Sequence, residues 1–396
     1  MDTMLWIIAA VLIDAAAVCA WIFLISRFDK HRKQKNQTRL LVYFYLIGMA
    51  SYFVSAVTYF PFALITRPLY GGRWDVNYFF YHLFVVGTSE ELIKFLAFAF
   101  LAVKLKSIKE LKDGILQACS TALGFAAVEN FDYGRYYGLE VLARRFYRAT
   151  VGHVLLAVIW GAVFAVVFIE YWDEPRKTRI KYIFSSLVPA ALLHGLGNFF
   201  LEINLFFVSS LIDIVTGIAG LFLFAYLRKH SPYRDLPLHQ YKAILPHIYK
   251  ALKRHPEDFE LNYRAGKYSL YGKRYPPAAR HFQICSEKRP KSASLRLLHG
   301  VSLFGSGDRG EAGKVFSKWF SDLDETQKYL VMKKLEPYRL SYQMERELFS
   351  YLGIDEWAKG YRIEKMKRNR YVDRNGKPYK EVLDEKTNEL RSILAK

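Results

Sequence analysis

The chain is poor in cysteine and in acidic residues, and its second half lacks any long apolar run. Its 396 residues include three cysteines, Cys19, Cys119 and Cys285, and these form no CxxC pair. That spacing argues against a disulfide framework and against a cysteine-rich metal site. No HExxH motif occurs either. This absence excludes the kind of zinc site that takes two histidines and a general base from one helix.

Charge and hydrophobicity divide the chain into two different halves. Lysine and arginine (57) outnumber aspartate and glutamate (37), which gives a formal net charge of +20, although 52% of the residues are hydrophobic. The apolar runs lie before residue 228, and the second half is dense in charged residues and tyrosine. We therefore expect an all-α protein with a polytopic membrane domain, 1–228, a soluble helical domain, 229–345, and a basic helical tail, 346–396.

Apolar segments of the length that an α-helix needs to cross a bilayer predict about seven transmembrane helices. They lie at about 4–25, 40–62, 78–103, 114–136, 149–171, 182–202 and 205–227. Alternate loops carry fourteen lysines and arginines on one side and six on the other. The excess of basic residues in cytoplasmic loops predicts a multi-pass protein of the cell membrane, with its amino terminus outside and its soluble half in the cytoplasm. Four arginines between residues 134 and 148 run against this rule.

The soluble half contains a repeat with a period of 34 residues. This shift places Gly266 on Gly300, Ala278 on Ala312 and Phe282 on Phe316. The pattern of small, small and aromatic residues, followed by Pro290, resembles a tetratricopeptide repeat. Stacks of such helical pairs hold a peptide or a partner protein, which is the role expected here. A generic pair of helical hairpins is the alternative.

The basic residues of the carboxyl-terminal stretch predict contact with anionic lipid head groups. The same charge could suit nucleic acid, but no groove-reading motif accompanies it. We therefore expect a lipid bilayer, and no nucleic acid, as a partner.

Four of the predicted spans contain polar side chains that an inert anchor does not need, because ionisable groups inside a bilayer are costly and usually functional. Several pairs are four residues apart and share a helix face. At 1.5 Å per residue they all lie roughly 5–20 Å below the outer surface. The candidate site residues are Glu90, Glu91, Glu129, His153, His194 and Asn198, with structural support from Lys94, Asn130 and Tyr133.

This set of residues suits the activation of water. A carboxylate in a poorly hydrated pocket is a stronger base and can take a proton from water. Two imidazoles can bind a metal, or one can orient water while the other protonates a leaving group. An amide one turn from His194 could donate to a developing oxyanion. Lys94 is expected to offset part of the charge of Glu90. Either Glu90 or Glu91 could be the base, since neighbouring residues on a helix point about 100° apart.

The order and spacing of four motifs resemble the PrsW family of membrane-embedded proteases, which belongs with the CAAX prenyl endopeptidases and bacteriocin-processing proteins. The motifs are EExxK at 90–94, ENxxY at 129–133, the histidine at 153 and HxxxN at 194–198. The resemblance covers roughly residues 40–227.

The resemblance implies an endopeptidase that cuts a membrane-associated protein, such as an anti-sigma factor, from the outer side in regulated proteolysis. It implies that Glu90 or Glu91 activates water, that His153 and His194 assist, and that Asn198 helps to form an oxyanion hole. The family is described as metalloproteases. If zinc binds, its ligands must come from separate helices, for example Glu129, His153 and His194. A tetratricopeptide-like domain is not part of the core family pattern, so the substrate stays open.

Two other functions remain as alternatives to a protease. Intramembrane carboxylates and histidines also serve transporters and proton relays, although the spans show no inverted repeat or broken helix pair. The chain could also be a membrane-anchored scaffold whose working part is the repeat domain.

Overall fold

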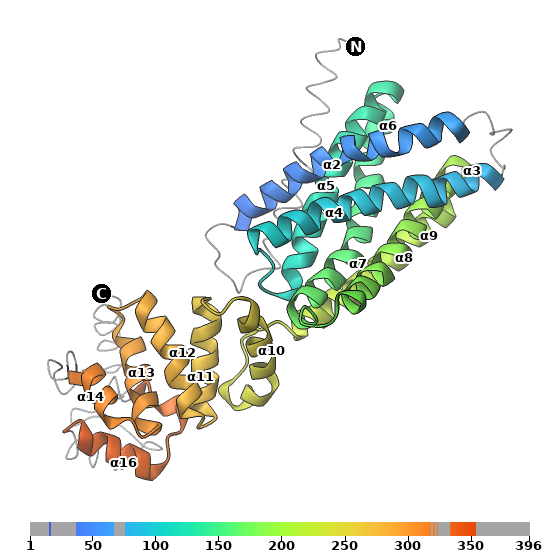
Figure 1. Cartoon of the computed structure of the whole chain (residues 1–396). Coiled ribbons are helices and arrows are strands. Elements are labelled where there is room, and N and C mark those ends of the chain that lie inside the picture. Colours follow the sequence, from blue (N-terminus) through green and yellow to red (C-terminus); the bar gives the residue numbers. More distant parts are fainter. Residues whose placement is uncertain are drawn as a thin grey trace, which may run out of the picture. The chain divides into compact units, whose positions relative to one another are not determined.

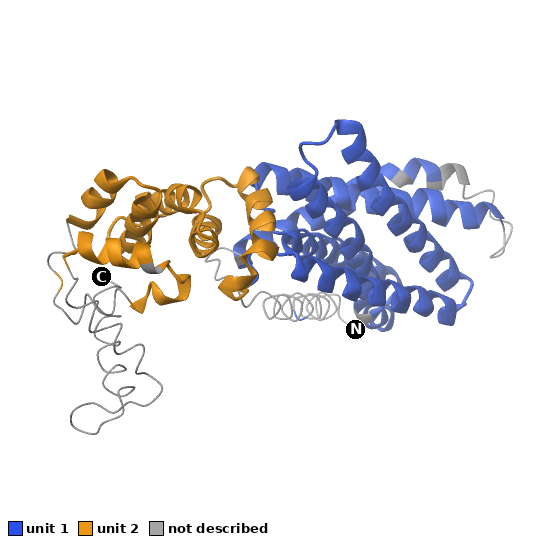
Figure 2. Cartoon of the chain, turned by 90° about the horizontal axis from the view of Figure 1, so that it is seen from below, with its two compact units in different colours: residues 1–234 blue, residues 235–396 orange. Residues whose placement is uncertain are grey.

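The computed structural model describes residues 37–66, 76–317 and 333–353, together with the single residues Ala16, Phe320 and Leu323. Within these residues the chain is helical and contains no strand (Figure 1). The predicted all-α class is therefore confirmed for this part of the protein. The chain forms two compact units, residues 1–234 and 235–396 (Figure 2). The predicted first span, 4–25, and most of the predicted basic tail lie outside the described residues.

The first unit is a bundle of helices that begin and end close to the predicted spans. They are α2 (Gln37–Thr66), α3 (Val76–Phe80), the π-helix η2 (Tyr81–Val86), α4 (Gly87–Leu105), α5 (Leu111–Tyr137), α6 (Leu139–Tyr147), α7 (Ala149–Glu170), α8 (Arg176–Glu202) and α9 (Phe206–Lys229). The segments α3, η2 and α4 follow one another without a break.

Four helical segments in the described part of the chain are long and apolar enough to cross a membrane. They are Thr38–Phe62, Leu139–Glu170, Arg176–Glu202 and Phe206–Lys229. The helices α4 and α5 form where spans were predicted, but their polar content keeps them out of this group. Seven transmembrane helices therefore stay a prediction, whereas a membrane protein with several apolar helices is established.

The core of the first unit holds an aromatic cluster next to the polar site. The rings of Phe95 and Phe98 pack against those of Trp160 and Phe164, with centroids 5.1–5.9 Å apart. These ring contacts stabilise α4 against α7 through close packing, because aromatic pairs in such geometries attract one another and packing is what holds helices together in lipid. The helix α5 lies between α2 and α7 and makes its most extensive contacts with them.

The second unit consists of paired helices. Its elements are η3 (Leu238–Gln240), α10 (Tyr241–Arg254), α11 (Phe259–Tyr271), α12 (Tyr275–Lys288), α13 (Ala293–Gly305), α14 (Arg309–Ser317), η4 (Glu336–Tyr338) and α16 (Tyr342–Tyr351). The 34-residue shift relates equivalent contacts in the structure as well as equivalent residues in the sequence. A Cβ atom added to Gly266 would lie 2.8 Å from the Phe282 ring, and one added to Gly300 would lie 2.5 Å from the Phe316 ring. The absent side chains let α12 and α14 pack closely on their partners.

Candidate active site

The continuous helix formed by η2 and α4 meets α8 at two glycines beside the polar residues. A Cβ atom on Gly87 would lie 2.4 Å from the backbone oxygen of Ala191, and one on Gly195 would lie 2.5 Å from the backbone oxygen of His82. No side chain larger than hydrogen fits at either position. The close crossing brings the carboxylates of α4 within reach of His194 on α8. The π-helix η2 is part of this crossing, since Gly195 packs on its residues His82 and Leu83. Such π-helical turns are frequent at functional sites.

Glu91 is fully buried, and both of its carboxylate oxygens accept hydrogen bonds. Lys94 Nζ donates to Oε1 at 2.5 Å, and His194 Nδ1 donates to the same oxygen at 2.7 Å. Trp160 Nε1 donates to Oε2 at 3.0 Å. Three donors from three helices therefore hold the Glu91 carboxylate in one position.

Glu90 has a different environment although it is the next residue. It is 5% exposed, and its Oε2 lies 3.5 Å from His194 Nε2 and 4.0 Å from Lys94 Nζ. This oxygen has no hydrogen-bond partner within the described part of the chain. A buried carboxylate oxygen without a donor costs free energy unless something else binds it. Of the two carboxylates, Glu90 is thus the one with an unsatisfied oxygen.

His153 on α7 lies between a cation and a carboxylate. Lys94 Nζ is 3.0 Å from its Nδ1, and Glu129 Oε2 is 2.8 Å from its Nε2. An ammonium can only donate and an ionised carboxylate can only accept. These contacts therefore specify the neutral ring that carries its proton on Nε2. The His153 and His194 rings lie with their centroids 5.1 Å apart.

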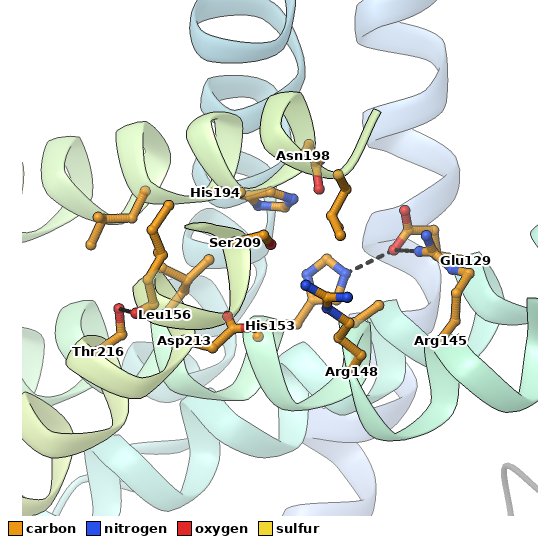
Figure 3. Close-up of a pocket in the computed structure, with 16 residues that line it drawn as sticks. Glu129, Arg145, Arg148, His153, Leu156, His194, Asn198, Ser209, Asp213 and Thr216 are labelled. Carbon is orange, nitrogen blue, oxygen red and sulfur yellow. Dashed lines mark hydrogen bonds and ion pairs between the residues drawn. The ribbon is translucent and has the colours of Figure 1, made fainter. Parts of the chain in front are cut away.

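An arginine of α6 compensates the negative charge of Glu129. Arg145 Nη2 lies 2.8 Å from Glu129 Oε2 (Figure 3). The same guanidinium donates from Nε to Asn130 Oδ1 at 3.2 Å and stacks 3.7 Å from the centre of the Tyr133 ring. Asn130 Nδ2 donates to Thr150 Oγ1 at 2.9 Å. The predicted supporting residues Asn130 and Tyr133 therefore lie around Arg145 and not around Glu90.

A pocket opens on the side of the histidines that faces α9. It has a cavity volume of about 60 Å³, room for a few water molecules. Glu129, His153, His194 and Asn198 contribute to its wall, together with Arg148 and Asp213 (Figure 3). Glu90 and Glu91 do not line it. Asn198 is thus placed beside the histidines, within the same pocket and one turn from His194.

Sequence reasoning missed Trp160, Arg145 and Arg148. In the sequence, Trp160 is one apolar residue among many in a predicted span. Only the folded structure places its indole N–H next to Glu91. The arginines did give a signal, because the basic loop between residues 134 and 148 departs from the charge rule that the other loops follow. Arg145 compensates Glu129, and Arg148 donates to the backbone oxygen of Phe206 at 2.8 Å.

The donor atoms of Glu90, His153 and His194 all lie within 4.8 Å of one another, and all three residues are buried. Two imidazoles and one carboxylate are a known ligand set of catalytic zinc sites. The unpartnered Oε2 of Glu90 fits this chemistry. The free lone pair of His153 lies on Nδ1, 3.0 Å from the Lys94 ammonium, so a divalent cation bound by these three residues would displace that ammonium. The group differs in one member from the predicted set, because Glu90 stands where Glu129 was expected.

Comparison with known proteins agrees with the motifs. A family model described as PrsW family intramembrane metalloprotease matches residues 36–232. Protease PrsW of Bacillus subtilis is 31% identical over 176 residues, which are 41% of this chain and 77% of that protein. Protease PrsW of Clostridioides difficile is 33% identical over 125 residues, 30% of this chain and 51% of that protein. Protease PrsW of Oceanobacillus iheyensis is 30% identical over 151 residues, which are 35% of this chain and 66% of that protein. No solved structure matches the chain.

Proposed function

The chain belongs to the PrsW family of intramembrane proteases, and on that premise we propose that it hydrolyses a peptide bond of a membrane-associated protein with water activated at Glu90. The observation that carries this proposal is the buried Oε2 of Glu90, which lacks a hydrogen-bond partner in the described residues and faces His194. A general base needs a free lone pair within hydrogen-bond reach of the proton that it takes.

Glu91 and its three donors position His194 for this reaction. The bond from His194 Nδ1 to Glu91 fixes the proton on Nδ1 and leaves the Nε2 lone pair directed at Glu90. A carboxylate that orients a histidine in this way sets both its tautomer and its angle. Lys94 compensates the charge of Glu91 and touches His153 as well. Glu91 is therefore a positioning residue in our proposal.

Glu129 and Asn198 complete the proposed site. Glu129 accepts from His153 Nε2 and holds that ring in place, while Arg145 offsets the charge of Glu129. Asn198 lines the pocket next to His194, and its amide N–H can donate to the oxyanion that forms when water attacks a carbonyl.

If the protein uses a metal ion, we propose Glu90, His153 and His194 as its ligands, with zinc as the first candidate. A bound zinc ion lowers the pKa of a coordinated water and polarises a carbonyl. Glu129 would then be the carboxylate that orients a ligating histidine, a common arrangement around metal sites.

The test of the proposed function uses the purified full-length chain in detergent micelles with fluorescein-labelled casein as a generic protein probe. Glu90→Gln and His194→Ala should lower the rate of cleavage roughly 100-fold or more. Glu140→Gln is the control, because Glu140 is an exposed residue of α6 that pairs with the exposed Arg144 of the same helix. A chelator should abolish cleavage and zinc should restore it if the metal is needed. Full activity of both site variants would overturn the proposal.

The proposed topology keeps the amino terminus outside and the second unit in the cytoplasm, as the basic loops indicate. A reporter that fluoresces only in the cytoplasm, fused after Lys396, should then be bright in cells. A periplasmic or secreted reporter at the same place should be inactive. The opposite pattern would show that the protein has the reverse orientation in the membrane.

For the second unit we propose a tetratricopeptide-like stack that holds a peptide or a partner protein. The equivalent contacts of Gly266 with Phe282 and of Gly300 with Phe316 support this proposal. A transporter or a simple scaffold is not favoured, because the similar proteins are proteases.

A further inference from the structure

The pocket beside the histidines contains two glycines whose missing side chains leave it open. Gly152 directly precedes His153 on α7, and Gly197 directly precedes Asn198 on α8. Each glycine is therefore adjacent in sequence to a residue of the proposed site, and both line the same cavity.

Neither glycine is required for the packing of helices. A Cβ atom on Gly152 would meet Asp213 Oδ1 first, at 3.4 Å, and one on Gly197 would meet only Ser209 Oγ, at 4.0 Å. Both distances are ordinary contacts. Gly195, two residues before Gly197, differs because its Cβ atom would lie 2.5 Å from backbone atoms of His82 and Leu83. Glycine within a helix is unfavourable relative to alanine, so the space itself is what these two positions provide.

The room above the two glycines is small and partly polar. The cavity volume is about 60 Å³, and Ser209, Asp213 and Thr216 of α9 form its far wall. Thr216 Oγ1 already donates to the backbone oxygen of Ile212, so this part of the wall needs no partner. Directly over the glycines, Asp213 Oδ1 and Ser209 Oγ lie 3.4 and 4.0 Å from where a Cβ atom would stand, which is the room that a small side chain such as that of alanine or serine needs.

We propose that Gly152 and Gly197 determine specificity: the space over them receives a small side chain of the substrate residue that flanks the cleaved bond. This proposal rests on the proposed protease function. It predicts that an added methyl group at either position narrows the pocket and leaves the fold intact. Gly217→Ala is the matched control, because a Cβ atom on Gly217 meets only Leu155, at 3.6 Å, and Gly217 does not line the pocket.

The first experiment measures the space without any cleavage. The three native cysteines are replaced by alanine, and Ser209→Cys places a thiol in the pocket. Methyl methanethiosulfonate should label this thiol readily, whereas the bulkier N-benzylmaleimide should label it slowly. Added Gly197→Ala or Gly152→Ala should slow labelling by the small reagent roughly 10-fold, the effect of one methyl group in a tight pocket. Equal labelling in these variants and in the Gly217→Ala control would overturn the proposal.

The second experiment maps the bonds that the full-length chain cuts in casein by mass spectrometry. The wild-type chain should cut beside glycine, alanine or serine. Gly152→Ala and Gly197→Ala should cut roughly 10-fold more slowly, with melting temperatures at or above that of the wild type. Cleavage beside bulky residues, or variants as fast as the wild type, would contradict the proposal. If the wild-type chain cuts no casein, this soluble probe is not a substrate, and the labelling experiment still decides whether the glycines shape the pocket.

Discussion

At the scale of single residues, two adjacent glutamates on α4 have unequal surroundings. Glu91 is 0% exposed and accepts three hydrogen bonds, one of them from the fully buried Lys94. Glu90 keeps one oxygen without a partner among the described residues. In our proposal, stability and reactivity therefore separate onto two neighbouring positions: Glu91 maintains the structure of the site, and Glu90 performs the chemistry.

Glu90→Gln should abolish cleavage and leave thermal stability nearly unchanged, because the oxygen that it alters makes no hydrogen bond in the described structure. Glu91→Gln should lower both, since it removes the carboxylate that lies nearest to the buried ammonium of Lys94. Loss of one member of a buried pair costs about 3–5 kcal/mol. The measurement is thermal unfolding in detergent together with the casein assay. Equal loss of stability in the two variants would refute the division of roles.

In the second unit, His281 is expected to make stability depend on pH. Burial, and to a lesser extent the neighbouring Arg280, lower the pKa of His281 from 6.5 to about 4. The unfolded chain therefore binds a proton at higher pH than the folded chain does. The stabilising contribution is complete above about pH 6.5 and is lost as the pH falls towards 4.

This dependence is measured by urea unfolding of the second unit between pH 7 and pH 4. His281→Gln should make stability decline less steeply over this range than in the wild type, because the glutamine does not titrate. Its amide can keep a hydrogen bond to Asn262 Oδ1, the present partner of His281 Nδ1. Curves of equal slope would show that His281 does not contribute.

At the scale of helices, the second unit repeats one packing device. In each of two helical pairs a glycine of the first helix contacts a phenylalanine ring of the second. The phenylalanines are buried, and Ala278 and Ala312 are fully buried at equivalent positions. Close approach of the two helices therefore depends on a hydrogen atom where any other residue would have a carbon.

Gly266→Ala and Gly300→Ala should each destabilise the second unit by about 1–3 kcal/mol, the usual cost of overpacking a core. Gly310→Ala is the control, because its Cβ atom would have only Asp308 Oδ1 nearby, at 4.0 Å. Chemical unfolding followed by circular dichroism gives the comparison. Helix propensity by itself would make all three changes stabilising, because alanine is the better helix former. Gly266→Ala and Gly300→Ala variants as stable as Gly310→Ala would therefore contradict the role of the ring contact.

At the scale of the whole molecule, the first unit includes the residues that follow its last helix. Ser231 donates a hydrogen bond to Glu110, and Tyr233 is 2% exposed. Glu110 is the N-cap of α5, the helix that carries Glu129 near its other end. The segment 231–234 therefore stabilises an element of the proposed active site.

A chain that ends at Arg234 should keep the melting temperature and the casein cleavage of the full-length protein. A chain that ends at Lys229 should be less stable, because the buried Glu110 would lose its bond from Ser231. Hydrogen bonds to charged groups contribute about 1.5–3 kcal/mol. The two truncated proteins are compared by thermal unfolding in the same detergent. Equal stability would show that the segment after α9 does not support α5.

Local chemistry along the sequence determined the helices and the identity of the polar residues. Apolar length predicted where six described helices form, and spacing by four predicted which polar residues share a face. The 34-residue period identified the glycines and phenylalanines that pack together. Each of these features depends on residues near one another in the chain or on a repeated pattern.

Only the tertiary structure distinguished Glu90 from Glu91. They are adjacent on one helix, and the groups that separate their roles, Trp160 and His194, come from positions 69 and 103 residues beyond Glu91. The same holds for Arg145 beside Glu129 and for the pocket over Gly152 and Gly197. Helix periodicity sets the direction of each side chain. The crossing of α8 with the continuous helix η2–α4, at Gly87 and Gly195, determines which groups that side chain contacts.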